Sequence, residues 1–450
     1  MAAWLVAGAP LGCPEGTDRR WLTFFSEVDH AWTLLRQGRS QEAAPLLGDA
    51  LAGATSDLVV AHECSVGIAA AYRLLSLAHV MQSSLLGLAR RRAFQVGLRF
   101  MHLASNWLTH AFVAHGADAS FIDDSAWPLT LQESVDEHRA VMTMLSEGGR
   151  PAGHRPIEQV PHDYRHPSLS VAIVSLCAYP DGHVLPKYAM SNHRIYAQRH
   201  GYEYLPCTER VDGGRPAAWG KVKLMQKYVE QRRWDWVMWA DCDLFFMNLS
   251  VTLDSLLFRY GGVPAEGASS GGTLRAERPL RLDPAFHFLV TEDHAMLNTG
   301  TFLARSSAWS EGMLRRVWGP DEGSPWAEHP WWEQAAMAWD FWAELPARFR
   351  GANHAEWARQ ASPVDDEMEG IYPEAVRVAP QGEFNSYHPI TSRFLADTWS
   401  PGKFALAFNG VSSSSSPNVA SELYGSYYEL FCALNNLGDR CLKVSETPPW

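Results

Sequence analysis

Short apolar segments alternate with helical segments between residues 170 and 240, and this alternation restricts the fold more than any other feature. The runs 170–177, 202–206 and 236–240 are predicted to be strands, because they are short, apolar and rich in β-branched or aromatic residues. Segments 188–200 and 219–233 are predicted to be helices. This order predicts an α/β fold with an open, mostly parallel sheet, in which ligands bind at the carboxyl ends of the strands.

The chain before this segment has a different character. Apolar residues recur every three or four positions up to about Ser146, which predicts an all-helical N-terminal region over residues 1–147. Residues 36–47 faintly resemble one tetratricopeptide helix pair, but no second copy follows at a fixed period, so a helical bundle or cap is favoured over a solenoid. Glycine and proline then predict a linker over 148–167, with one layered domain over 168–450. The helical region is a candidate surface for a protein partner.

Composition narrows the function. The 450 residues are 46 % hydrophobic, enough for a substantial core, and 38 Lys and Arg against 50 Asp and Glu give a net charge of −12. Because the basic residues are scattered, a nucleic-acid partner is not expected. No secretory signal and no membrane-spanning run is visible. Among seven cysteines without a C-x-x-C pair, only Cys432 and Cys441 are close enough to suggest a local bridge.

Two aspartates follow directly after the predicted strand 236–240. In an extended segment, the side chains of Asp241 and Asp243 would point to the same side and could share one hard divalent cation. Such a cation offsets the charge that grows on a diphosphate leaving group, which is the chemistry that a sugar-nucleotide donor needs. A buried strand before the pair and the apolar run 244–247 after it favour this reading over two solvated turn carboxylates.

Four blocks of this sequence resemble glycosyltransferase family 34, the galactosyl/mannosyl transferases that include plant xyloglucan xylosyltransferases. The most specific is the Leu-Asn-Thr-Gly-Thr-Phe-Leu-Ala-Arg run at 297–305, which closes on Trp-Ser. The blocks are 234–248 with the Asp-Cys-Asp, 292–310, 332–334 with Trp-Glu-Gln, and 378–387.

The resemblance implies a GT-A type nucleotide-diphospho-sugar transferase fold and a manganese-dependent transfer with retention of configuration. It implies a UDP-sugar or GDP-sugar as donor, an oligosaccharide or glycoprotein as acceptor, and a Golgi location, membrane-associated or lumenal. Asp241 and Asp243 would hold Mn²⁺, Gln334 would face the anomeric carbon, and Glu333 would bind donor hydroxyls. The residues expected to bind donor or acceptor are Lys221, Asp293, Asn298, Gly300, Trp332 and Asn385.

One position departs from the family pattern. The family usually has a metal-binding histidine in a Phe-x-x-His-Phe-x-Gly segment, and the matching segment here, 404–410, has Ala407 at that position. Three alternatives follow: fewer protein ligands with added water, a substitute such as Asn409 or His388, or a domain that has lost activity and serves as a binding module.

A haloacid-dehalogenase-type phosphatase also uses Asp-x-Asp after an apolar strand. It is disfavoured, because its domain normally begins with that strand.

Overall fold

The computed structural model describes residues 19–54, 65–80, 156–265, 280–293, 297–319, 327, 332–344, 373–389, 398–409, 411 and 417–442. The chain divides into two compact units, which are described separately. The first comprises Met1–Gly153, Asp293–Leu297 and Pro320–Pro373, and the second comprises His154–Glu292, Asn298–Gly319 and Glu374–Trp450. The predicted helical residues 81–147 and the linker residues 148–155 lie outside the described part.

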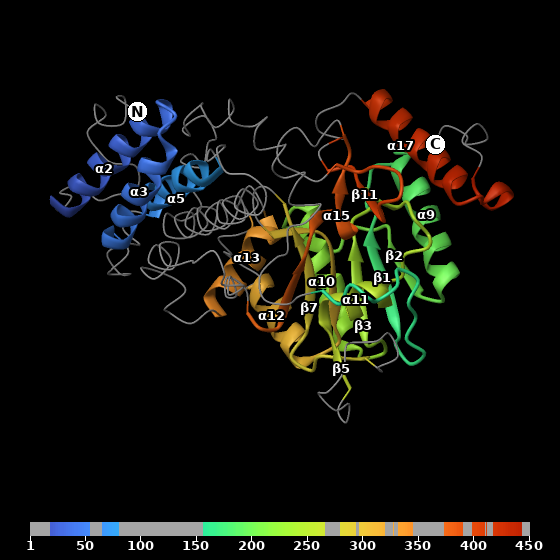
Figure 1. Cartoon of the computed structure of the whole chain (residues 1–450). Coiled ribbons are helices and arrows are strands. Elements are labelled where there is room, and N and C mark those ends of the chain that lie inside the picture. The colour runs from blue at the N-terminus through green and yellow to red at the C-terminus, as the bar shows by residue number, and fades with distance from the viewer. Residues whose placement is uncertain are drawn as a thin grey trace. The chain divides into compact units, whose positions relative to one another are not determined.

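The first unit contains a group of packed helices at its N-terminal end (Figure 1). These are α2 (Arg19–Arg36), α3 (Ser40–Ala54) and α5 (Ser65–Val80), and α13 (Trp332–Glu344) also belongs to this unit. Gly38 adopts a positive φ of 74° in the turn between α2 and α3, a conformation that glycine adopts without steric cost. Trp21, Leu47 and Tyr72, from α2, α3 and α5, are buried in one apolar core. The predicted helical character is therefore confirmed for residues 19–54 and 65–80, the part of this region that the structure describes.

The second unit is built on a six-stranded sheet of order β2-β1-β3-β8-β7-β9. Strand β1 pairs in parallel with β2 and with β3, and β7 pairs in parallel with β9, whereas β3 and β8 are antiparallel. The predicted α/β class with a mostly parallel sheet is confirmed. The strands are β1 (Val171–Leu176), β2 (Glu203–Cys207), β3 (Trp236–Ala240), β7 (Phe288–Glu292), β8 (Leu297–Arg305) and β9 (Val376–Ala379).

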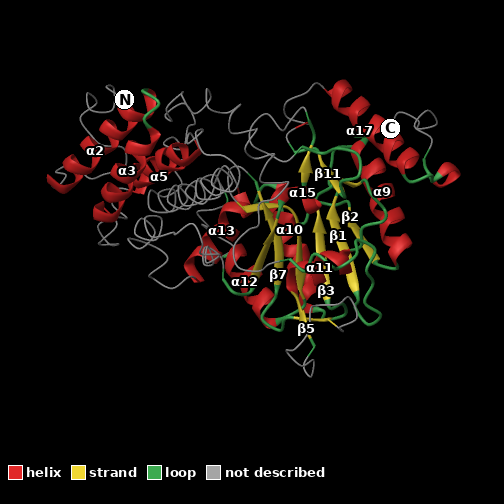
Figure 2. Cartoon of the chain, in the orientation of Figure 1, coloured by secondary structure: helices red, strands yellow, loops and turns green. Residues whose placement is uncertain are grey.

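Helices cover this sheet, as Figure 2 shows. The predicted helices 188–200 and 219–233 correspond to α9 (Leu185–His200) and α10 (Gly220–Glu230), which begin and end within three residues of the predicted bounds. Helix α9 ends at Gly201, which takes a left-handed conformation with a φ of 68°. The others are η3 (Ala217–Trp219), α11 (Leu253–Gly261), α12 (Ala308–Trp318), α15 (Gln381–Phe384), α17 (Pro417–Leu434) and η5 (Gly438–Arg440).

Two small sheets complete the unit. In the first, of order β10-β11-β4, strand β4 (Leu244–Phe246) pairs antiparallel with β11 (Ala405–Ala407), which pairs in parallel with β10 (Ser386–Tyr387). The second joins β5 (Gly262–Pro264) to β6 (Leu280–Leu282). Because β4 begins one residue after Asp243, the three-stranded sheet fixes the polypeptide that leaves the aspartate pair.

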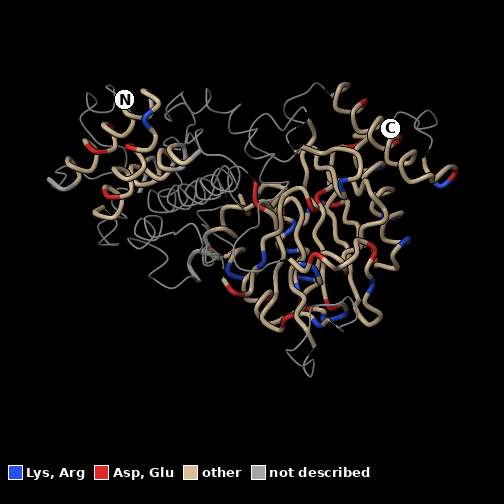
Figure 3. Tube along the Cα trace, in the orientation of Figure 1, with Lys and Arg blue, Asp and Glu red and all other residues tan. Residues whose placement is uncertain are grey.

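Charged side chains of both signs are interspersed along the described parts of the chain (Figure 3). In the residues that the structure describes, no helix is both long and apolar enough to cross a bilayer. Two disulfides join cysteines that lie in the described part of the chain. The predicted bridge between Cys432 and Cys441 is confirmed, and Cys177 pairs with Cys242, which sequence spacing did not suggest.

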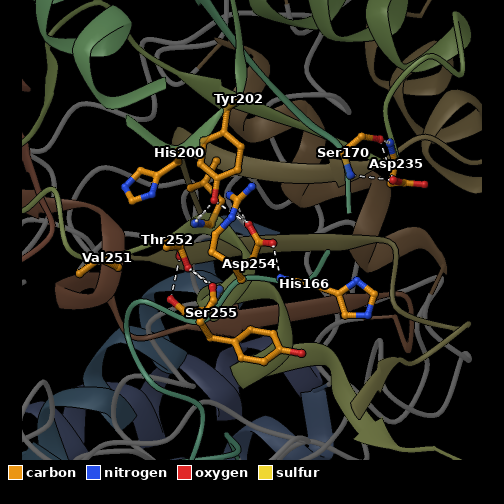
Figure 4. A network of polar contacts seen from close by, with 12 residues as sticks. His166, Ser170, His200, Tyr202, Asp235, Val251, Thr252, Asp254 and Ser255 are labelled. Atoms are coloured by element: carbon orange, nitrogen blue, oxygen red, sulfur yellow. Dashed lines mark hydrogen bonds and ion pairs between the residues drawn. The ribbon is translucent and has the colours of Figure 1, made fainter. Parts of the chain in front are cut away.

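A buried polar network joins α11 to the segment before β1 (Figure 4). The carboxylate of Asp254, fully buried in α11, accepts hydrogen bonds from the Tyr202 hydroxyl at 2.6 Å and from the His166 backbone NH at 2.9 Å. It also pairs with Arg165 at 2.9 Å. One carboxylate thus ties three separate donors to the start of the helix, where an acidic side chain is favoured by the helix dipole.

We expect Asp254→Ala to lower the free energy of unfolding by about 3 kcal/mol, because it leaves buried donors without an acceptor. Asp235 is the matched control: it is exposed and accepts comparable bonds from the Ser170 NH and hydroxyl. Asp235→Ala should cost only about 1 kcal/mol. Chemical denaturation measures both variants, and equal losses would contradict the importance given to burial at Asp254.

Candidate active site

Asp241 and Asp243 lie in a tight turn at the carboxyl end of β3. The NH of Leu244 donates to the carbonyl of Asp241 at 3.1 Å, which closes a four-residue turn before β4 begins. The prediction that an extended backbone aligns the two side chains is therefore wrong in its geometry. The prediction that the pair lies at the carboxyl end of a buried strand is confirmed, since every residue of β3 is buried.

A disulfide holds this turn in place. Cys242, between the two aspartates, is bonded to Cys177, which directly follows β1, and both are almost fully buried. The carboxyl ends of β1 and β3 are therefore covalently joined at the aspartate pair. The sequence signal that was available was position alone, because each cysteine stands at the end of a predicted strand of the same sheet.

Three groups hold Asp241. Its NH donates to the Gly300 carbonyl at 2.9 Å, and its Oδ1 accepts from the indole NH of Trp239 at 2.6 Å. The Nζ of Lys221 lies 3.3 Å from the same Oδ1 and donates to the Thr299 carbonyl at 3.0 Å. Lys221 is only 4 % exposed, so its charge interacts with the Asp241 carboxylate and the Thr299 carbonyl rather than with solvent.

Strand β8 brings the Leu-Asn-Thr-Gly block to the aspartates. Because β8 is antiparallel to β3, with Ala240 opposite Thr301, the start of β8 lies beside the end of β3. A Cβ added at Gly300 would lie 3.5 Å from Asp241 Oδ2 and 3.1 Å from Asn298 Oδ1. Glycine here lets the Asn298 and Asp241 side chains pack closely against the β8 backbone.

Two buried amides extend this cluster. Asn298 Oδ1 accepts from the Gly300 NH at 2.8 Å and from Asn385 Nδ2 at 2.6 Å, while the Asn298 amide donates to the Tyr387 hydroxyl. The Oδ1 of Asn385, fully buried, has no hydrogen-bond partner in the described structure. A buried acceptor without a donor is costly, so this oxygen is suited to a ligand hydroxyl. Sequence-predicted residues Lys221, Asp241, Asn298, Gly300 and Asn385 thus lie together.

The two carboxylates affect each other electrostatically. Burial raises the pKa of Asp243, the negative charge of Asp241 raises it further, and the positive charge of Lys221 opposes both effects. Sequence reasoning did not identify Tyr179, which is exposed to the same negative charges. Burial and then the charges of the two aspartates raise the pKa of its hydroxyl. An excess of negative charge in a partly buried place is relieved by a divalent cation, so this pair fits a hard metal such as Mn²⁺.

Ala407 lies beside the aspartate turn. It pairs with Leu244, and the NH of the next residue, Phe408, donates to the Asp243 carbonyl at 2.8 Å. The alternative histidine, His388, donates its NH to the Ala407 carbonyl, but its ring stacks on Phe408 in the aromatic core, where burial lowers its pKa to about 4. Among the described residues, no three His, Cys, Asp or Glu form a group that could hold a metal. His388 is therefore not grouped with the two aspartates.

Helix α9 supports the strand that follows the aspartates. The side chain of Asn192 accepts from the Phe246 NH at 2.7 Å and donates to the Phe246 carbonyl at 3.1 Å. The Nε2 of His193, fully buried, lies 2.6 Å from the Leu244 carbonyl. These positioning residues were not predicted, because a polar pair in the middle of a helix carries no sequence signal for a strand 50 residues away.

His193 makes stability depend on pH. Burial lowers its pKa to about 4, whereas an imidazole in the unfolded chain titrates near 6.5. The unfolded chain therefore binds more protons between these values, and stability falls as the pH decreases through this window. Between pH 7.5 and pH 5, we expect the free energy of unfolding to fall by about 2 kcal/mol less in His193→Gln than in the wild type. Chemical denaturation at the two pH values measures this difference. An unchanged difference would contradict the neutral buried histidine.

The other predicted residues belong to the first unit. Trp332, Glu333 and Gln334 share the first turn of α13, where Trp332 is exposed with a φ of 43° and Glu333 is buried. Asp293 is buried and directly follows β7. Asp241 belongs to the second unit, so the roles assigned to these four residues stay predictions.

Comparison with known proteins finds a family likeness. Residues 171–340 match the model of the galactosyl transferase GMA12/MNN10 family, and this match contains β3, the aspartate turn and β8. This segment is therefore similar to that family. The likeness agrees with the family resemblance and the α/β fold predicted from the sequence.

Two relatives and one structure illustrate the likeness. A probable alpha-1,6-mannosyltransferase of Saccharomyces cerevisiae is 27 % identical over 166 residues, 34 % of this chain and 39 % of that protein. An uncharacterized alpha-1,2-galactosyltransferase of Schizosaccharomyces pombe is 30 % identical over 149 residues, 28 % of this chain and 37 % of that protein. The match thus spans less than two fifths of these relatives. A glycosyltransferase involved in glycosylation of the PBCV-1 major capsid aligns at 14 % identity with a TM-score of 0.36, over 57 % of this chain and 99 % of that one.

Proposed function

We propose that this domain transfers a hexose or pentose from a nucleoside-diphosphate sugar to a glycan acceptor, with retention of configuration and with Mn²⁺ at Asp241 and Asp243. The observation that carries the proposal is the cluster in which β8 brings Asn298 and Gly300 against the aspartate turn. Carboxylates for a metal and buried amides for hydroxyls are the two groups that a diphosphate sugar requires, and here they are adjacent.

Each residue of the cluster has a distinct task. Asp241 and Asp243 hold the cation, which supplies Lewis-acid stabilisation of the leaving diphosphate. Lys221 and Trp239 fix the Asp241 carboxylate through its Oδ1, whereas its Oδ2 lies beside Gly300. The unpartnered Oδ1 of Asn385 accepts a donor hydroxyl. By resemblance, Gln334 faces the anomeric carbon, Glu333 binds the donor sugar, and Trp332 and Asp293 contact donor or acceptor.

The donor identity is tested by a screen of UDP-galactose, UDP-xylose, UDP-glucose and GDP-mannose with the purified chain. We expect release of nucleoside diphosphate from at least one donor, and release should require Mn²⁺. A chain that instead turns over a generic phosphate monoester, and no donor, would favour the phosphatase alternative. A Golgi location and a glycoprotein or oligosaccharide acceptor stay part of the proposal.

Ala407 favours a second candidate, a transferase-like domain that binds donors without turning them over. Its buried position opposite Leu244 leaves no imidazole at this point of the aspartate turn. Donor binding in calorimetry without any Mn²⁺-dependent nucleotide release would support this binding module.

A further inference from the structure

Asn409 has features of a metal ligand. Its Oδ1 is buried, and in the part of the chain that the structure describes no donor reaches it. An amide oxygen accepts only, so it is satisfied by a hydrogen-bond donor or by a cation. Because hard divalent cations bind amide carbonyl oxygens as well as carboxylates, this orphaned oxygen is a kind of ligand that could complete the aspartate pair.

The backbone brings this residue to the aspartate turn. Strand β11 runs antiparallel to β4 up to the pair of Ala407 with Leu244, and the next bond joins the Phe408 NH to the Asp243 carbonyl at 2.8 Å. Asn409 is the following residue and lies in a turn that the Val411 NH closes on the Phe408 carbonyl at 3.0 Å. The ring of Phe408 is committed to the core, where it contacts Phe245 at a centroid distance of 5.0 Å.

No histidine, cysteine or further carboxylate completes the aspartate pair in the described residues. The His388 ring stacks on Phe408. Lys221 is a cation and repels a metal. A neutral oxygen is therefore the remaining kind of protein ligand beside Ala407.

We propose that Asn409 supplies, through its Oδ1, the third protein ligand to the divalent cation of Asp241 and Asp243, in place of the imidazole absent at Ala407. The proposal rests on the proposed function, because it takes the two aspartates as metal ligands. It assigns the substitution to a residue two positions along the same segment, so the local metal site keeps three protein ligands.

The test measures Mn²⁺ binding to the full chain by electron paramagnetic resonance, without donor or turnover. Free aqueous Mn²⁺ gives a sharp signal that is lost on binding. We expect Asn409→Ala to weaken Mn²⁺ binding about tenfold, within the range seen when groups around a metal are removed. Asn409→Asp keeps the oxygen and adds charge, so it should bind Mn²⁺ at least as tightly as the wild type. Circular dichroism checks that each variant is folded.

Asn248 is the matched control. It is a partly buried asparagine whose amide donates to the Gly402 carbonyl, so Asn248→Ala should leave Mn²⁺ binding unchanged. Unchanged binding in Asn409→Ala, or weaker binding in Asn409→Asp, would overturn the assignment. Asp243→Asn separates the two levels: if it abolishes binding while Asn409→Ala does not weaken it, only the Asn409 assignment fails. If Asp243→Asn leaves binding intact, the metal site of the proposed function fails instead.

Discussion

Replacement of Asp243 by Asn is expected to reduce Mn²⁺-dependent donor hydrolysis by about 10³-fold, which corresponds to about 4 kcal/mol of transition-state stabilisation. The substitution keeps the size of the side chain and removes one of two charges that hold the cation. Because Asp241 is already paired with Lys221 at 3.3 Å, the remaining carboxylate is partly neutralised and cannot hold the metal alone. Nucleotide release in saturating Mn²⁺ and donor measures the loss.

The fold of this variant should be unaffected or more stable. Removing the Asp243 charge relieves its repulsion from Asp241, which together with burial raises the Asp243 pKa in the native chain. Asp235→Asn, at an exposed carboxylate before β3, is the control and should keep full activity. Hydrolysis by Asp243→Asn at the wild-type rate would show that the assigned metal role is wrong.

Loss of the bridge between Cys177 and Cys242 is expected to lower the free energy of unfolding by about 4 kcal/mol, because the bridge closes a loop with a sequence separation of 65. The bridge between Cys432 and Cys441 spans a separation of only 9, so its removal should cost about 2.5 kcal/mol. Double alanine variants of each pair, compared by chemical denaturation, measure both losses. Replacing both cysteines of a pair avoids leaving one of them unpaired.

The two pairs should also differ in their effect on the site. Cys242 lies between the two aspartates that we propose as metal ligands, so the Cys177→Ala/Cys242→Ala variant should bind Mn²⁺ more weakly than the wild type. The variant at the C-terminal pair should bind Mn²⁺ normally. Equal stability losses for the two pairs, with unchanged Mn²⁺ binding in both, would contradict the view that the bridge fixes the aspartate turn.

The sequence predicted the parts of this fold that depend on local pattern. The strands around Ala172 and Val237 and the helices between them have periodicity and composition that are visible within short windows. The position of Asp241 at the end of a buried strand followed directly from that pattern. The C-terminal bridge was predicted for the same reason, since its cysteines are close in the chain.

The rest of the site depends on long-range pairing, which local pattern does not encode. The antiparallel register of β8 on β3 places Gly300 against Asp241, although the two residues are 59 positions apart in the sequence. The bridge from Cys177 to Cys242 and the amide contact between Asn385 and Asn298 also join residues that are far apart in the sequence. Resemblance to the family named four of these residues as binding groups, but only the structure shows how they meet.

The turn at Asp241 shows that a motif can be placed correctly in the fold while its backbone conformation is predicted wrongly. Alternation along an extended segment predicted two aligned carboxylates, but the bond from the Leu244 NH to the Asp241 carbonyl closes a turn instead. The carboxylates still interact, because the reversal keeps Asp243 near the strand end where Asp241 lies. A short motif identifies chemistry more securely than it identifies backbone conformation.

The most direct test of the account is time-resolved proton NMR of the wild-type chain with the donor that the screen selects, with Mn²⁺ or with a chelator. The account predicts that the donor is consumed only with Mn²⁺, and that the first sugar released keeps the anomeric configuration of the donor. Consumption that is unaffected by the chelator, or a donor that binds and stays intact in Mn²⁺, would contradict metal-assisted glycosyl transfer at Asp241 and Asp243.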